Sequence, residues 1–87
     1  TGFILSQNYP NPFNPTTKID FTCPKRSKVK LEILDLSGRR VAILLDEVRE
    51  AGSHSIDFDG SNLSSGIYVY KLTTSDNMLV RKMLLVK

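Results

Sequence analysis

The side chains best suited to chemistry in this 87-residue sequence are one cysteine, one histidine and a few aspartates. Cys23 follows Phe21 and Thr22 and precedes a proline, with no histidine or second cysteine close to it in sequence. A reactive thiol needs neighbours that lower its pKa, so the pattern favours a small buried apolar residue. A single cysteine cannot form an internal disulfide, so the domain must rely on its core or on an attached partner domain.

His54 alternates with Ile56 and Phe58, which predicts that its side chain faces the core near a strand start. Catalytic or metal-binding histidines work with a second histidine or a paired carboxylate, and the sequence offers neither pattern. We therefore interpret His54 as structural and expect neither enzymatic activity nor a cofactor. Three aspartates would bind Ca²⁺ only if loops brought them together, because no EF-hand spacing is present: Asp57, Asp59 and Asp76.

The charge pattern argues against two further classes of function. The net charge is +3, and the basic residues occur in separated pairs rather than in long runs. Nucleic-acid-binding domains gather Lys and Arg on one stretch or face, so we expect no nucleic-acid partner. No stretch approaches the roughly 18 apolar residues that a membrane helix requires, so we expect no membrane insertion. The chain opens without Met or a basic leader, which predicts a domain excised from a longer protein.

Short strands must position these residues. Apolar and polar residues alternate along most of the chain, and only residues 41–49 leave a helix open as an alternative. Turns rich in Gly, Asp, Asn and Ser recur about every 8–12 residues. The sequence therefore predicts one all-β domain over residues 1–87, an immunoglobulin-like β-sandwich of about seven antiparallel strands. The predicted strands are residues 18–22, 28–34, 40–45, 53–58, 67–73 and 78–86.

Within the predicted strand 40–45, the alternation places Val41, Ile43 and Leu45 on one face. Residues 46–51 are polar and are expected to connect this strand to the next. Tyr68 and Tyr70 share one face of a strand dense in β-branched and aromatic residues, as expected of a central strand. We expect both tyrosines to pack in the core while each hydroxyl finds a hydrogen-bond partner.

Residues 1–15 are expected to form an ordered opening that contains a proline-rich segment. Its prolines fix φ and lack amide donors, so it cannot be a helix or a central strand. Tyr9 and Phe13 are spaced to pin it to a hydrophobic surface, and its asparagines are expected to form Asx-turns. We interpret it as a structural loop rather than a polyproline docking ligand. The segment comprises Asn8, Tyr9, Pro10, Asn11, Pro12, Phe13, Asn14 and Pro15.

Glycines and aspartates occupy the predicted turns. Glycine adopts φ values that cost other residues about 1 kcal/mol or more, and carboxylates accept hydrogen bonds from turn amides. We therefore expect turn chemistry from Asp35 and Asp59, and special backbone conformations at four glycines. These glycines are Gly38, Gly52, Gly60 and Gly66.

The last predicted strand is the best candidate for contact with a partner protein. Met83 and Leu85 face one way, and Lys82 and Leu84 face the other. If the strand lies at a sheet edge, its free amides and carbonyls can pair with a partner strand. The alternative is a plain final strand that closes the sandwich. The candidate residues are Arg81, Lys82, Met83, Leu84, Leu85, Val86 and Lys87.

A series of motifs follows one order along nearly the whole chain. They are Leu5 to Thr17, Asp35-Leu36-Ser37-Gly38-Arg39, Ala51-Gly52-Ser53-His54, Asp59-Gly60, Leu63 to Tyr70 and Lys82 to Lys87. This order closely resembles the C-terminal sorting domains of type IX secretion substrates (Por secretion tails, type A) of Bacteroidetes and relatives. Three positions depart from the family pattern, each with an apolar residue in place of another: Cys23, Leu34 and Phe58. A related Ig-like domain occurs in flagellar hook-capping proteins.

The resemblance implies a non-catalytic, seven-stranded Ig-like module at the end of a larger cargo protein. It implies passage via the periplasm through the type IX machinery to the cell surface or medium, with a shuttle protein and a sortase-like peptidase as partners. The alternative is a structural Ig-like spacer or assembly domain of a multidomain extracellular protein. A carbohydrate-binding sandwich would require a row of exposed aromatic side chains, and the chain has no Trp and three Tyr.

Overall fold

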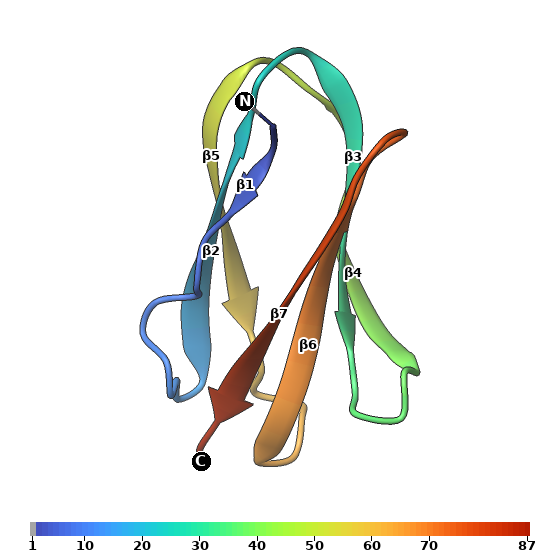
Figure 1. The fold of residues 1–87 in the computed structure, drawn as a ribbon. Coiled ribbons are helices and arrows are strands. Elements are labelled where there is room, and N and C mark those ends of the chain that lie inside the picture. The colour runs from blue at the N-terminus through green and yellow to red at the C-terminus, as the bar shows by residue number, and fades with distance from the viewer. Residues whose placement is uncertain (1) are drawn as a thin grey trace.

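The computed structural model describes residues 2–87, which form seven strands in two antiparallel sheets packed face to face (Figure 1). One sheet has the strand order β1-β2-β5 and the other β4-β3-β6-β7. The predicted all-β, Ig-like sandwich is confirmed. No helix in this part of the chain could cross a membrane. The strands are β1 (Ile4–Leu5), β2 (Thr16–Cys23), β3 (Ser27–Leu34), β4 (Arg40–Arg49), β5 (Gly52–Asp59), β6 (Gly66–Thr73) and β7 (Met78–Leu85).

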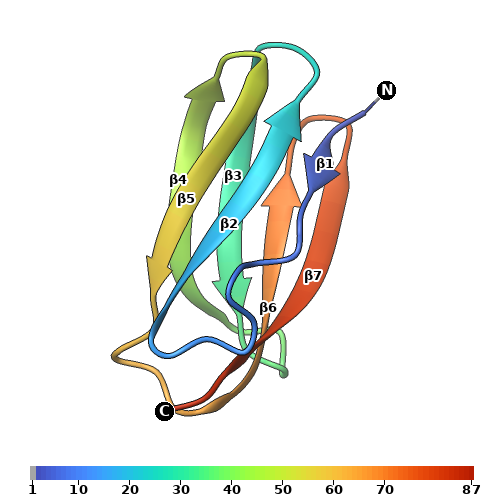
Figure 2. The same cartoon turned by 90° about the vertical axis from the view of Figure 1, so that its left-hand side faces the viewer.

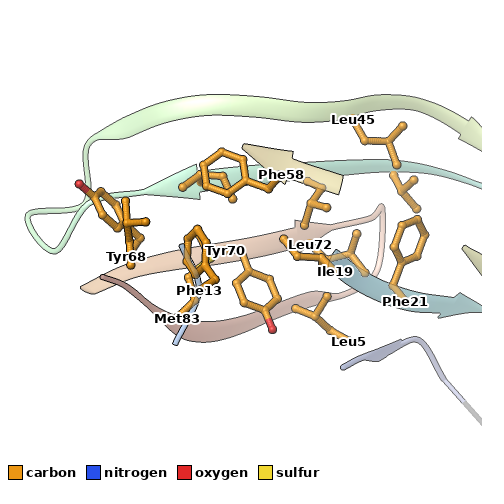
Figure 3. Close-up of a cluster of buried hydrophobic side chains, with 14 of the residues drawn as sticks. Leu5, Phe13, Ile19, Phe21, Leu45, Phe58, Tyr68, Tyr70, Leu72 and Met83 are labelled. Carbon is orange, nitrogen blue, oxygen red and sulfur yellow. The ribbon is translucent and has the colours of Figure 1, made fainter. Parts of the chain in front are cut away.

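The core lies between the two sheets; alternate residues of β2, β3, β6 and the end of β7 fill most of it, and β1, β4 and β5 each add one buried residue (Figure 3). Val29, Leu31 and Ile33 of β3 are fully buried, as the alternation predicts. Burying one such side chain stabilises the fold by about 1.5–3 kcal/mol, so this central strand is a main source of stability. The core comprises Leu5, Phe13, Ile19, Phe21, Cys23, Val29, Leu31, Ile33, Leu45, Phe58, Tyr68, Tyr70, Leu72, Met83 and Leu85.

Strand β4 differs from its prediction in length and in facing. It continues through residues 46–49, which the sequence had indicated as a polar connection, because these residues pair with β3. Two register shifts in the β3–β4 pairing interrupt the alternation. Leu45 lies opposite Leu31 and is buried, whereas Ile43 lies opposite Glu32 and is exposed. The prediction that Ile43 and Leu45 share a face is therefore wrong, since a β-bulge inserts an unpaired residue between them.

Two of the predicted turn glycines are required for different reasons. Gly38, in the β3–β4 turn, has a φ of 89°, which a residue with a Cβ adopts only at a cost. Gly60 does not have a positive φ, so the expectation of a special conformation there is wrong. A Cβ at Gly60 would lie 3.2 Å from Leu85 Cδ2 and 3.3 Å from Phe13 Cε2, so the requirement at this position is for space.

The connections gather at two ends of the sandwich (Figure 2). The β2–β3, β4–β5 and β6–β7 turns lie at the upper end, near the N-terminus. The β3–β4 and β5–β6 connections, the proline-rich segment and the C-terminus lie at the lower end. The segments that bear the family-like motifs at the two ends of the sequence therefore meet at the lower end.

Candidate partner-binding site

Strand β7 is an edge strand, because β6 is its only ladder partner in the part of the chain that the structure describes. Its side chains divide by face as the alternation predicts. Met83 and Leu85 are buried in the core, whereas Lys82 and Leu84 are exposed, as is Val86 just beyond the strand. Only the second group is presented for contact with a partner, so the first group positions the strand.

The proline-rich segment covers the lower edge of β7. The Phe13 amide donates to the Leu84 carbonyl at 2.9 Å, and the Val86 amide donates to the Phe13 carbonyl at 3.0 Å, which forms a parallel bridge. The Leu84 amide donates to Asn11 Oδ1 at 2.9 Å. The Asx-turn predicted at Asn11 is therefore wrong, because its side chain caps a strand more than 70 residues away.

Side chains close the same edge further along. Gln7 Nε2 donates to the Lys82 carbonyl at 2.7 Å, and Arg81 Nε donates to the Leu5 carbonyl at 2.6 Å. The Lys82 carbonyl, the amide and carbonyl of Leu84 and the Val86 amide are thus already bonded within the chain. The expectation that they are free to pair with a partner strand is wrong for this half, since an earlier segment of the same chain occupies the position.

A buried polar cluster fixes the start of the proline-rich segment. The Tyr70 hydroxyl donates to the Ser6 carbonyl at 2.6 Å and accepts from the Asn8 amide at 2.8 Å. Asn8 Nδ2 donates to Thr17 Oγ1 at 3.0 Å and to the Pro10 carbonyl at 3.1 Å. Burial raises the pKa of the Tyr70 hydroxyl above its ordinary value, so it remains a donor at neutral pH. The expectation of a bonded tyrosine hydroxyl is confirmed.

Phe13 anchors the segment, and Tyr9 does not. Phe13 is buried and contacts the Phe58 ring edge to face, with ring centroids 6.1 Å apart. Tyr9 is 81% exposed, so its predicted role as a second hydrophobic pin is wrong. The Tyr9 amide and carbonyl both bond to the backbone of Lys18, and this pairing leaves the phenol ring on the solvent side.

The turn aspartates act as predicted. Asp35 Oδ1 accepts from the Ser37 hydroxyl and from the Arg39 amide at 2.9 Å, and these bonds lower the pKa of its carboxyl. Asp59 Oδ1 accepts from the Ser61 hydroxyl and amide, which lowers the pKa of that carboxyl in the same way. Both carboxylates brace turns at the lower end, where hydrogen bonds favour their charged form.

The C-terminal lysine is held against the β5–β6 connection. The Lys87 amide donates to Ser65 Oγ at 3.0 Å, and Lys87 Nζ donates to the Ser61 carbonyl at 2.5 Å. Tyr68 belongs to the same corner, since its hydroxyl donates to the Ser64 carbonyl at 2.7 Å. Such a tyrosine corner, with the ring packed near a strand start and its hydroxyl bonded a few residues upstream, is typical of Ig-like sandwiches.

Cys23 and His54 are both held in packing and hydrogen-bonding environments. Cys23 is buried, and burial raises the pKa of its thiol. His54 stacks on Phe21 with ring centroids 5.2 Å apart, and its Nε2 lies 2.8 Å from the Glu50 carbonyl oxygen. Across residues 2–87 no three His, Cys, Asp or Glu side chains converge in a way that could hold a metal ion.

One buried acid was missed by the sequence reasoning. Glu32 lies on the outer face of β3 and is mostly covered, although the alternation predicts an exposed side chain. Its carboxylate lies 3.4 Å from Arg40 Nη1 and 3.8 Å from both Lys30 Nζ and Lys71 Nζ. Two of these partners come from β4 and β6, so only the sheet register could have revealed the cluster.

The fold, the tyrosine corner and the bonded chain ends define a small Ig-like β-sandwich module. The chain belongs to the family of secretion system C-terminal sorting domains, whose model matches residues 7–87. Membership supports a role as a sorting signal of type IX secretion, and implies a secreted or cell-surface protein.

One solved structure supports the fold independently. The chain is similar to part of PorZ from Porphyromonas gingivalis, described as an essential bacterial surface component of the type IX secretion system. The TM-score is 0.62 at 16% identity, and the match covers 99% of this chain but 12% of the PorZ chain. At this identity the likeness shows the fold alone. No curated protein matches the sequence.

Proposed function

We propose that this chain is a C-terminal sorting module that directs a larger secreted protein through the type IX secretion system to the cell surface or medium. The family match across residues 7–87 carries the proposal. The structure agrees with such a role, because the module closes on itself at the lower end and presents a fixed terminal strand. The module acts as a folded recognition shape rather than through bond-making chemistry.

The partners in this proposal are the shuttle protein and the sortase-like peptidase of the secretion machinery, with a cargo domain upstream. Recognition runs through the exposed side chains of the terminal strand, chiefly Lys82, Leu84 and Val86. Their backbone is fixed by the buried Met83 and Leu85 and by the bonds to Phe13. Because the backbone is already fixed, the strand presents these side chains in a defined arrangement and loses little conformational entropy when a partner binds.

The test is a transplant of the module. Residues 1–87 are fused behind a signal-peptide-bearing fluorescent protein in a host with type IX secretion, and fluorescence is located. Surface or medium fluorescence that disappears in a translocon mutant is the expected result. Periplasmic retention of a folded fusion would overturn the proposal and favour a structural spacer domain.

The residues of the terminal strand require point variants rather than a truncation. Deleting residues 83–87 would remove the buried Met83 and Leu85, so loss of export would report only unfolding. The double variant Leu84→Ser/Val86→Ser changes two exposed side chains and keeps every backbone bond. We expect it to fold and to lose export. A folded double variant exported at the normal level would contradict recognition through this strand.

A further inference from the structure

The outer face of the three-stranded sheet is almost entirely polar. Its residues alternate with the buried ones in the β2–β5 pairing, so they point away from the core. Two large side chains with apolar surface are exposed at separate places on it: Ile4 of β1, which pairs with Thr22, and Tyr9, which bridges to Lys18. Such a face gives a partner little apolar area to bury. The polar residues are Thr16, Lys18, Asp20, Thr22, Ser53, Ser55, Asp57 and Asp59.

The outer face of the four-stranded sheet is different, because apolar side chains lie in adjacent rungs across it. One rung of paired residues runs Ile43, Glu32, Lys71, Val80. The next rung on this face consists of Arg40, Leu34, Val69 and Lys82. Below it, Ile67 pairs with Leu84. Exposed apolar side chains gathered on one face of a small domain mark an interaction surface. We name this surface the cationic face; its apolar members are Leu34, Ile43, Val48, Ile67, Val69, Met78, Val80 and Leu84.

The charges of the two faces are opposite in sign. The cationic face bears five basic and two acidic side chains, whereas the polar face bears one basic and three acidic ones. Glu32 forms ion pairs with Lys30, Arg40 and Lys71, and Asp46 pairs with Lys28. Five basic minus two acidic side chains therefore leave a net excess of three positive charges on this face. The charged residues of the cationic face are Lys28, Lys30, Glu32, Arg40, Asp46, Lys71 and Lys82.

A hollow of 170 Å³ lies at the lower end of the cationic face, where Asn11 of the proline-rich segment meets β6 and β7. Ile67, Leu84, Lys82 and Met83 line it together with Asn11. The hollow has room for one apolar side chain of a partner, which would lie beside a cation. Burying aliphatic area beside fixed charge is how protein interfaces combine affinity with specificity.

We propose that the cationic face binds a folded protein partner whose surface places carboxylates around an apolar centre. The inference rests on the proposed function, since it names the chemistry of the partner that the exported module meets. Charge complementarity selects this occupant. A second copy docked face to face would bring like charges together, and docked on the polar face it would meet no apolar patch. The face carries no aromatic side chain of the kind that anchors proteins in a membrane interface.

The first arm of the test removes apolar area with a matched control. Ile43→Thr/Ile67→Thr keeps β-branched side chains on the cationic face, and Ile4→Thr makes the same change on the polar face. In the fluorescent fusion we expect export by the double variant to fall about tenfold or more, as for the loss of roughly 1.4 kcal/mol of binding, with Ile4→Thr unchanged. Thermal unfolding of each isolated domain verifies folding.

The second arm reverses charge. Lys82→Glu is expected to reduce export, whereas Lys18→Glu on the polar face leaves it unchanged. Suppressors selected in the host against Lys82→Glu are expected to exchange an acidic residue for a basic one on a partner protein. Suppressors found only within this chain would overturn the proposal.

The remaining outcomes separate the proposals. Wild-type retention in the periplasm defeats the proposed function itself. If the wild-type fusion is exported and the folded variants Ile43→Thr/Ile67→Thr and Lys82→Glu are exported equally well, the inference about the cationic face is overturned and the proposed function stands. Binding of the wild-type domain to phosphatidylglycerol vesicles, abolished by Lys82→Glu, would assign the face to lipid and overturn it. A stable dimer in light scattering, lost in Ile43→Thr/Ile67→Thr, would assign it to a second copy and also overturn it.

Discussion

The two halves of the outer edge of β7 are protected in different ways. In the lower half, the proline-rich segment bonds to the backbone at Leu84 and Val86, and Asn11 and Gln7 add side-chain bonds. In the upper half, β1 lies beside β7 without forming a ladder with it. A groove of 290 Å³ separates the two strands there, and a bond from Arg81 to Leu5 crosses it.

The contrast shows how a small sandwich can close an edge without lengthening its sheet. An exposed edge strand invites pairing with other chains, and a covering strand would present a new edge of its own. Prolines have no amide donor, so a segment that includes Pro10, Pro12 and Pro15 bonds through a few residues and offers few donors outward. The lower edge is therefore covered by a segment that is itself a poor template for another strand.

Removing the anchor of the lower closure should have the largest effect. Phe13→Ala leaves a cavity between Phe58, Leu85 and Gly60, and we expect it to lower the free energy of unfolding by about 3–5 kcal/mol. Urea unfolding followed by circular dichroism measures this change. A loss below about 1 kcal/mol would mean that the segment contributes little to the fold.

Tyr70→Phe tests the polar cluster that fixes the same segment. It removes a hydroxyl with two backbone partners, Ser6 and Asn8, and leaves buried groups unsatisfied. We expect a loss of about 1–3 kcal/mol in unfolding free energy. Tyr68→Phe removes a hydroxyl with one partner, Ser64, and serves as the matched control. Equal losses in the two variants would contradict a special role for the cluster.

The stability of the domain should be far less sensitive to changes in the upper half of the β7 edge. Arg81→Ala removes a part-buried bond from an exposed arginine to the Leu5 carbonyl, and we expect a cost of about 1 kcal/mol. Hydrogen exchange should show faster exchange in β1, with no change at Phe13 or Val86. Faster exchange along the whole edge would show that the two halves open together.

Acid should loosen the lower end before the rest. The folded-state pKa values of Asp35 and Asp59 are lowered by bonds to Ser37 and Ser61, so their contribution is present above their ordinary pKa of 3.8. It is lost as the pH falls through the folded values. We expect the amides of Ser37 and Ser61 to lose protection first in hydrogen exchange below pH 4. Asp59→Asn should flatten this dependence at Ser61 alone, and an unchanged acid response there would refute the assignment.

Much of the fold was predictable from the sequence because alternation is a local signal. It correctly predicted strands at residues 18–22 and 78–86, and it separated Met83 and Leu85, which are buried, from Lys82 and Leu84. It failed at Ile43, since a bulge in the β3–β4 pairing depends on a partner strand that the pattern does not contain. The same cause underlies Glu32, whose cationic neighbours are assembled by register.

The candidate site was predictable only in outline. Its terminal strand followed from the sequence, whereas its edge position was only a condition of the prediction and the cover on that edge was not foreseen. Asn11 was expected to bond to its own neighbours, because an asparagine in a proline-rich loop usually does. Tyr9 was expected inside because it is aromatic, and a backbone bridge to Lys18 places it outside. Contacts between the two ends of a chain produce no periodic pattern in the sequence of either end, so they could not be predicted.

The parallel bridge between Phe13 and Leu85 also determines how the domain responds to pulling. The chain begins at the upper end of the sandwich and its C-terminus lies at the lower end (Figure 1). The bridge joins the proline-rich segment to Leu85, the last residue of β7. A force that draws the two ends apart slides one bridged segment along the other. It therefore loads the bonds at Phe13, Leu84 and Val86 together, rather than peeling them one at a time. The bridge therefore resists a force applied between the two ends of the domain.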